Sequence, residues 1–357
     1  MKKIIVFLFF TFFLCSAQKK ITIKGYFDER LNGNIMLLRA YDDKYQDSQI
    51  KDSAEIKNGV NEIKNFEINH PGLYKVFITW GINHREKIES IYLDAINKTY
   101  YYDNEKNIKK VTGISKDQKE YNDFFAEVSE DEKALFKTKT NGVDDFMKLN
   151  LPILQKEDTL LLKFTKKHPN SYYALWQLVK KQKNDGYKII NENAFDNLLP
   201  KIRKSKLGLQ FSKDITAAKQ LLVGNVFPTE QFNNPSKIIL GEKYTLVDFW
   251  FSYCGPCIAQ IPKYLEINKK YSGKDFQIIQ ISTDVTKNLD NWKRIVKKYD
   301  LPWQSLLDEN AKISTAFNIN VFPTNFLLDS QGKILKRDIS QDDLEIYLGA
   351  SIKKVNN

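Results

Sequence analysis

Two cysteines in the stretch VDFWFSYCGPC, residues 247–257, are the side chains whose type and spacing most directly suggest chemistry. Cys254 and Cys257 are separated by Gly255 and Pro256, which set the geometry of the loop between them. Thiolates are good nucleophiles and good metal ligands, and a close pair can also form a disulfide. The pair could therefore be half of a metal site, a structural disulfide or a redox couple.

The rest of the sequence argues against the first two of these readings. A structural zinc ion takes four ligands, and the histidines His70, His84 and His168 lie in other segments, so we expect no metal. A disulfide across two intervening residues closes a very small loop, so it removes little chain entropy and adds little stability. Such a bond can open and close without unfolding the chain, as a redox couple requires.

The pair also lies where a predicted strand gives way to a predicted helix. Residues 245–251 have the composition of a buried strand, and residues 258–271 have the apolar spacing of an amphipathic helix. The N-terminus of a helix has free N–H groups and a partial positive charge, which stabilise a thiolate. We expect Cys254 to be the nucleophile and Cys257 to resolve the mixed disulfide, with Pro256 stiffening the loop.

Two motifs taken together resemble the thioredoxin family. VDFWFSYCGPC resembles its active-site strand and helix, and VFPTNFLLD (residues 321–329) resembles the loop whose cis proline faces the dithiol. The resemblance implies that Pro323 is this cis proline and that the residue before it pairs with an extended substrate. The substrate-binding residues that it implies are Tyr253, Trp250, Phe322 and Pro323.

The sequence is most similar to the exported thioredoxins of the TlpA/ResA type, over residues 223–355. The stretch from Ile278 to Pro323 is long enough for the additional strand and helix that this type carries. The residues before 223 resemble the accessory region found on such proteins in Bacteroidetes. The resemblance implies an α/β thioredoxin fold for residues 223–355 and thiol-disulfide oxidoreductase activity without a cofactor.

Three positions depart from the family pattern. Tyr253 replaces the usual tryptophan, Ile258 stands where a basic residue often follows, and Gln280 stands where thioredoxins carry a lysine. That lysine lies near a buried acid, which Asp248 matches, and burial without a cationic partner raises the pKa of a carboxyl. We hypothesise that Asp248 is the general base that takes the proton from Cys257. The alternative is a buried polar residue that only forms a hydrogen bond.

The remaining sequence divides by its hydrophobic pattern. Residues 19–112 are β-prone and predict a small sandwich-like or barrel-like domain. Residues 115–222 have helical spacing, with Ser171 as a helix N-cap, and residues 223–355 alternate strands with helices. The strands expected in the first part are residues 21–27, 34–41, 73–80, 90–96 and 99–103.

The N-terminus indicates export. Residues 1–17, MKKIIVFLFFTFFLCSA, combine two lysines, a short apolar run and small residues, as a signal peptide does. The alternative is a lipoprotein acylated at Cys15. Leu14 argues against it, because lipoprotein processing requires a small residue just before the cysteine. We expect an exported, periplasmic protein.

The net charge of +11 comes from lysines spread along the chain, so we expect no nucleic-acid partner.

These observations predict an enzyme that reduces disulfides in exported proteins through Cys254 and Cys257, and that receives electrons from a membrane thiol donor. A disulfide oxidase or isomerase remains an alternative, as does a binding module whose dithiol is vestigial. The sequence leaves open the substrate, the role of residues 19–222 and the oligomeric state.

Overall fold

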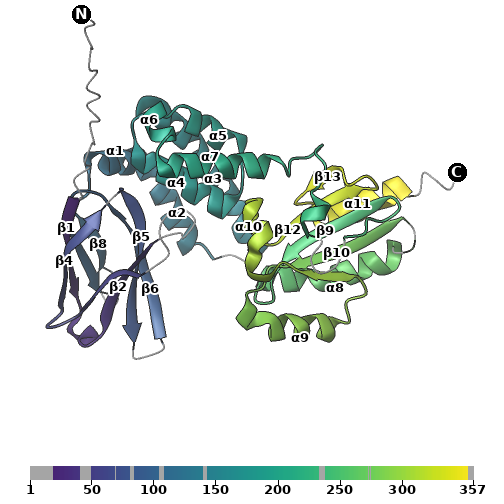
Figure 1. The fold of residues 1–357 in the computed structure, drawn as a ribbon, viewed down its shortest axis with the longest axis horizontal. Helices are drawn as coiled ribbons and strands as arrows, with labels where there is room; N and C mark the ends of the chain where they lie inside the picture. Colours follow the sequence, from purple (N-terminus) through teal and green to yellow (C-terminus); the bar gives the residue numbers. More distant parts are fainter. Residues whose placement is uncertain are drawn as a thin grey trace, which may run out of the picture. The chain divides into compact units, whose positions relative to one another are not determined.

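The computed structural model describes residues 19–40, 50–68, 70–80, 84–103, 108–139, 143–232, 238–271, 273 and 275–352. The predicted signal peptide and Cys15 therefore lie outside the described residues. The chain forms two compact units, Met1–Ser129 and Glu130–Asn357 (Figure 1). We describe each by itself.

The first unit is a sandwich of two four-stranded sheets, ordered β4-β1-β7-β8 and β3-β2-β5-β6 (Figure 1). Apolar side chains from both sheets form one shared core. The sandwich-like fold expected for this region is thus confirmed. Its strands are β1 (Lys19–Phe27), β2 (Ile35–Ala40), β3 (Ile50–Glu55), β4 (Val60–Ile68), β5 (Gly72–Trp80), β6 (His84–Leu93), β7 (Lys98–Asp103) and β8 (Ile108–Thr112).

Three of these strands, β3, β4 and β8, were not expected from the sequence. In β4 the buried residues alternate with exposed ones, which include Glu62, Lys64 and Glu67. Because its outward face is charged, the strand as a whole does not look apolar. The strand expected at residues 90–96 ends earlier, since β6 stops at Leu93.

Helices follow from residue 116 to residue 219, in the region where helical spacing predicted them. Ser171 caps α4 as expected, because its hydroxyl accepts a hydrogen bond from the backbone N–H of Ala174 at 2.9 Å. The helices are α1 (Lys116–Phe124), α2 (Ala126–Lys137), α3 (Val143–Lys167), α4 (Tyr172–Asp185), α5 (Ile189–Asp196), α6 (Pro200–Arg203) and α7 (Lys206–Lys219). The border between the two units falls within α2.

A buried ammonium group joins α3 to α4. Lys181 is 4% exposed, and its Nζ lies 2.6 Å from Glu157, 2.9 Å from Asp158 and 3.2 Å from Asp185. Burial lowers the pKa of this lysine, but the three carboxylates outweigh that effect and raise it well above its usual range. The cluster therefore keeps Lys181 charged inside the helical region.

The rest of the second unit is a five-stranded mixed sheet, ordered β11-β10-β9-β12-β13. The strands β9, β10 and β11 are parallel, and β12 and β13 are antiparallel to their neighbours. The strands are β9 (Tyr244–Trp250), β10 (Phe276–Ser282), β11 (Gln304–Leu307), β12 (Thr324–Asp329) and β13 (Ile334–Arg337). The helices are α8 (Gly255–Tyr271), α9 (Leu289–Tyr299), α10 (Lys312–Ala316) and α11 (Gln341–Ile352).

Alternation along β9 assigns its side chains to the two faces of this sheet. Val247 and Phe249 pack in one cluster with Phe227 and Phe232, from the segment before the sheet. Leu246 packs with residues of α8 and α11, and Trp250 packs with residues of α8 and α9. Asp248 lies between Leu246 and Trp250, so its carboxyl faces the side that α8 covers. The predicted strand at residues 245–251 corresponds to β9, and the predicted helix at residues 258–271 lies within α8.

Candidate active site

Cys254 and Cys257 form a disulfide at the N-terminus of α8, with their Cα atoms 5.2 Å apart. The carbonyl of Cys254 accepts the hydrogen bond of Ile258 N–H at 3.0 Å, which starts the helix. The backbone N–H of Cys257 donates to Cys254 Sγ at 3.2 Å. One of the free donors of the helix N-terminus therefore points at this sulfur. A donor in that place stabilises a thiolate when the bond is reduced.

The loop that leads into the dithiol is held by a buried carboxylate that sequence reasoning missed. Asp284 is 1% exposed and follows β10. It accepts hydrogen bonds from the backbone N–H and the hydroxyl of Ser252, at 2.9 and 2.7 Å, and from Ser282 Oγ at 2.7 Å. Asn291 on α9 donates to the carbonyl of Ser252 at 2.9 Å. These bonds fix the backbone two residues before Cys254.

The surroundings of the disulfide are apolar and only partly covered. Cys254 is 5% exposed and Cys257 is 2% exposed, whereas Tyr253, Gly255 and Pro256 are exposed. Rings and aliphatic chains from four segments pack around the two sulfurs. They include Phe251, Ile258, Trp292, Ile295 and Phe322. A polypeptide that docks here would meet an apolar rim around a nearly buried disulfide.

The loop before β12 lies beside this rim. The Phe322–Pro323 peptide bond is cis, as the resemblance implied. Phe322 packs against the cluster that contains both cysteines, and its ring meets that of Phe251 edge-on, with the centroids 5.5 Å apart. Two segments far apart in the sequence thus meet next to the disulfide. Substrate binding by Tyr253, Phe322 and Pro323 stays a prediction.

The contact predicted between Trp250 and substrate is not compatible with the structure. Trp250 is fully buried at the end of β9, where it packs beneath the two cysteines. The residue supports the dithiol from inside the protein and does not line its open side. Aromatic character alone does not distinguish these roles, because a strand residue just before a loop can face either way.

Asp248 is 2% exposed and has one hydrogen-bond donor beside it, Gln280 on the neighbouring strand β10. Gln280 Nε2 donates to Asp248 Oδ2 at 2.9 Å, while Asp248 Oδ1 is buried without a partner. Burial raises the pKa of Asp248 to about 7, and the bond from Gln280 lowers it only in part. Gln280 therefore stands next to the acid, where the resemblance placed it.

Sequence reasoning also missed Trp303, just before β11. Its indole Nε1 donates to Gln280 Oε1 at 2.9 Å. The sequence indicates only that Trp303 lies in the inserted segment. The hydrogen-bond partner of its indole depends on how β11 pairs with β10, and this register cannot be predicted from the sequence.

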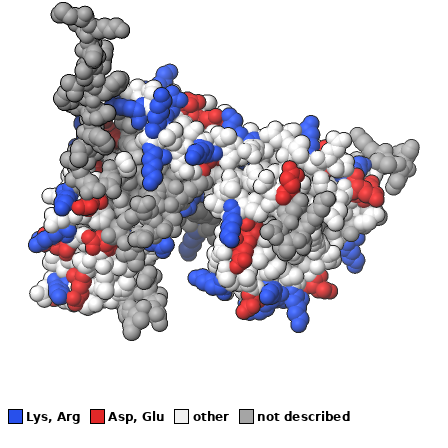
Figure 2. Space-filling view, in the orientation of Figure 1, with Lys and Arg blue, Asp and Glu red and all other residues white. Residues whose placement is uncertain are grey.

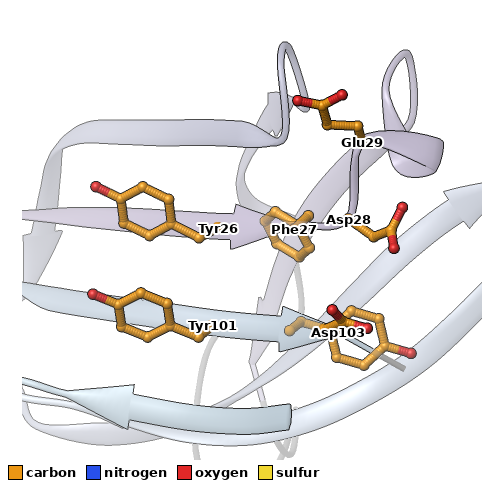
Figure 3. Close-up of a pocket in the computed structure, with 7 residues that line it drawn as sticks. Tyr26, Phe27, Asp28, Glu29, Tyr101 and Asp103 are labelled. Atoms are coloured by element: carbon orange, nitrogen blue, oxygen red, sulfur yellow. The ribbon is translucent and has the colours of Figure 1, made fainter. Parts of the chain in front are cut away.

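The first unit contains a cavity of its own, about 440 Å³ in volume. The rings of Tyr26 and Tyr101 stack there with their centroids 5.1 Å apart, and Asp28, Glu29 and Asp103 lie at the ends of the strands (Figure 3). Cross-strand packing accounts for the stacked tyrosines. The residues that line the cavity include no cysteine.

Three further observations concern the surface charge, the possible metal ligands and the length of the helices. Lysines and arginines are interspersed with acidic residues on the face shown in Figure 2, in keeping with a dispersed basic charge. Among the described residues, no group of three or more His, Cys, Asp or Glu side chains is placed to hold a metal ion. Within the same residues, no helix is long and apolar enough to cross a membrane.

The fold and the site together define a class. A parallel β9–β10 pair joined through α8, an antiparallel β12–β13 hairpin, a CxxC disulfide at the start of α8 and a cis proline before β12 make the C-terminal region a thioredoxin-like dithiol domain. The pattern of the Redoxin family matches residues 224–350. This region is similar to the thioredoxin-like domains of the TlpA/ResA type.

Curated relatives carry the same type of domain. Thiol-disulfide oxidoreductase ResA of Bacillus cereus is 33% identical over 112 residues, which are 30% of this chain and 64% of that protein. Thioredoxin-like protein YneN of Bacillus subtilis is 29% identical over 112 residues, 31% of this chain and 60% of that protein. The chain thus spans less than two thirds of either relative.

Solved structures also resemble part of this chain. A thiol:disulfide interchange protein from Bacteroides sp. is 27% identical and aligns with 38% of this chain and 92% of its own, with a TM-score of 0.33. The thioredoxin domain of a thiol-disulfide oxidoreductase from Bacteroides vulgatus is 25% identical and aligns with 37% of this chain and 99% of its own, with a TM-score of 0.31.

Proposed function

We propose that this protein is an exported thiol-disulfide oxidoreductase that reduces disulfides in other exported proteins. The observation that carries the proposal is the Cys254–Cys257 disulfide at the start of α8, with a backbone N–H directed at Cys254 Sγ. A disulfide across two residues has little structural value, whereas one at a helix N-terminus has an activated sulfur. The names of the curated relatives agree with this activity.

The reaction moves two electrons from the reduced dithiol to a substrate disulfide. The Cys254 thiolate attacks one substrate sulfur, so a mixed disulfide forms and the other substrate sulfur leaves as a thiolate that takes up a proton. Cys257 then gives its proton to Asp248, and its thiolate attacks Cys254 Sγ. The mixed disulfide breaks, the second substrate thiol is released, and Cys254 and Cys257 are oxidised to the disulfide.

Asp248 suits the role of proton acceptor because of its position and its proton affinity. Its carboxyl faces the side of the sheet that α8 covers, and Cys257 lies in the first turn of that helix. A pKa of about 7 lets the carboxyl accept a proton at neutral pH and release it again. The free Oδ1 leaves a lone pair available for that proton.

The direction of electron flow follows from the dipeptide between the cysteines. The reductant thioredoxin has a reduction potential of about −270 mV, whereas that of the oxidant DsbA is about −120 mV. The thioredoxin-like CGPC loop favours the reductant. In an oxidising compartment, the dithiol must be reduced again after each turnover, so we include a membrane thiol donor as a partner. A measured potential close to that of DsbA would reverse the direction.

A trapping experiment tests the proposal and identifies the substrates. In Cys257→Ser, Cys254 can still attack, but resolution is blocked, so substrates accumulate as mixed disulfides. We expect reductant-sensitive adducts that mass spectrometry places on Cys254. Cys254→Ser is the matched control, because it keeps one buried thiol but lacks the proposed nucleophile. Equal adducts in the two variants, or no reduction of insulin by the wild-type protein, would refute the assignment.

A further inference from the structure

We propose that Trp303 is a positioning residue for the dithiol reaction, which acts by fixing the orientation of Gln280 beside Asp248. The inference rests on the proposed function, since it concerns the base of that reaction. Its evidence is a chain of two hydrogen bonds, from Trp303 Nε1 to Gln280 Oε1 and from Gln280 Nε2 to Asp248 Oδ2, each 2.9 Å long.

The direction of these bonds is set by the tryptophan. An indole N–H can only donate, whereas a glutamine amide has a donor end and an acceptor end. With Trp303 in place, the oxygen of Gln280 is taken up by the indole, so the NH₂ group must face Asp248. In that orientation the amide stabilises the ionised carboxylate, which is the form that can accept a proton from Cys257.

Without the indole, the terminal amide of Gln280 is free to rotate by half a turn, so that its oxygen and its NH₂ group exchange places. Its oxygen would then accept a hydrogen bond from protonated Asp248, which stabilises the neutral form. Gln280 is 1% exposed and Asp248 is 2% exposed, so water does not readily replace either contact. Loss of the indole N–H of Trp303 would thus change which protonation state of Asp248 the amide of Gln280 stabilises.

The other groups that face Asp248 do not supply the missing donor. Asn325 pairs with Asp248 in the register of β12, but its amide is bonded at both ends to the backbone of Ile339, at 3.1 and 3.0 Å. Tyr264 on α8 stays neutral, because burial and the charge of Asp248 raise its pKa well above its usual range. Its hydroxyl accepts a hydrogen bond from Asn325 Nδ2 at 3.5 Å and does not donate to Asp248, whose Oδ1 has no partner. Asp338 acts electrostatically on Tyr264 in the same direction as Asp248.

The test compares Trp303→Phe with the wild-type full-length protein. The first readout is the titration midpoint of Asp248 in the oxidised protein, followed by carboxyl ¹³C NMR. The second is the pH profile of resolution in the reduced protein. A chromophoric aromatic disulfide releases one thiol when Cys254 attacks and a second thiol when Cys257 resolves. We expect both midpoints to move to higher pH by about one unit, a tenfold change in proton affinity.

Two further variants separate positioning from general damage. Gln280→Leu removes the donor itself and should shift the profile in the same direction, and it keeps the test open if Trp303→Phe does not fold. In an Asp248→Asn background, Trp303→Phe should no longer affect the second phase, because the pair acts through that carboxyl. A disruption of packing alone would persist in that background.

The outcomes distinguish this inference from the function on which it rests. Unchanged midpoints in Trp303→Phe and in Gln280→Leu overturn the role of Trp303, as does a shift that persists without Asp248. If instead the wild-type protein releases only the first thiol, the proposed reaction fails. The NMR midpoint in oxidised protein still decides whether Trp303 orients Gln280, because it requires no turnover.

Discussion

Replacement of Asp248 by asparagine should stabilise the oxidised protein, and by more at high pH than at low pH. The pKa of this carboxyl is raised from 3.8 to about 7 by burial. The folded state therefore binds more protons than the unfolded state between these two values. The contribution of Asp248 to the unfolding free energy of the wild-type protein is greatest below pH 3.8, decreases as the pH rises, and is lost above pH 7.

The size of the effect follows from the shift. A pKa change of about 3 units corresponds to about 4 kcal/mol between the two protonation states. Asparagine keeps the shape of the side chain but does not ionise. The difference in unfolding free energy between Asp248→Asn and wild type should thus grow by up to about 4 kcal/mol from acid to slightly alkaline pH.

Urea unfolding of the oxidised protein at a series of pH values measures this difference. Exposed Asp342 on α11 provides the control, because its replacement by asparagine removes a carboxyl that has no cost of burial. A difference for Asp248→Asn that does not change with pH, or that shrinks as the pH rises, would show that burial does not disfavour the ionised carboxyl. The proposed base would then lack its raised proton affinity.

Two further substitutions test the contacts around this site and in the helical region. Asp284→Asn should slow dithiol exchange and cost about 1–3 kcal/mol, because an amide cannot accept all the bonds from Ser252 and Ser282. Asp308→Asn, which disturbs a similar buried carboxylate at Ser314, should cost stability without the loss of rate. Lys181→Met removes the buried cation that three carboxylates share, and only Asp158 and Asp185 keep a second cation, Lys188. The variant should cost about 3–5 kcal/mol by thermal unfolding, whereas Lys180→Met at the exposed neighbouring position should cost little.

The predictable part of the site was local in sequence. The cysteines, Gly255, Pro256 and the cis Pro323 belong to short motifs, and their places follow from a strand that leads into a helix. Trp250 shows where local reasoning ends. A tryptophan before the loop could face solvent or core, and the alternation of β9 directs it inward. The polar strand β4 was missed for a related reason, since only one of its faces is buried.

The resemblance placed Gln280 near Asp248, but residue patterns alone could not predict the hydrogen bonds that join Trp303, Gln280 and Asp248, because these bonds depend on register. Gln280 is opposite Asp248 only when β10 pairs with β9 in one register, and a shift by one residue would turn its amide to the other face. Trp303 reaches Gln280 only if β11 adds to the far side of β10. A lysine next to Asp248 would stabilise the ionised carboxylate in any rotamer, whereas the amide of Gln280 does so only when its NH₂ group faces the carboxylate. With glutamine in place of lysine, the amide must therefore be oriented by another group, and the indole of Trp303 in the inserted segment provides the hydrogen bond that does this.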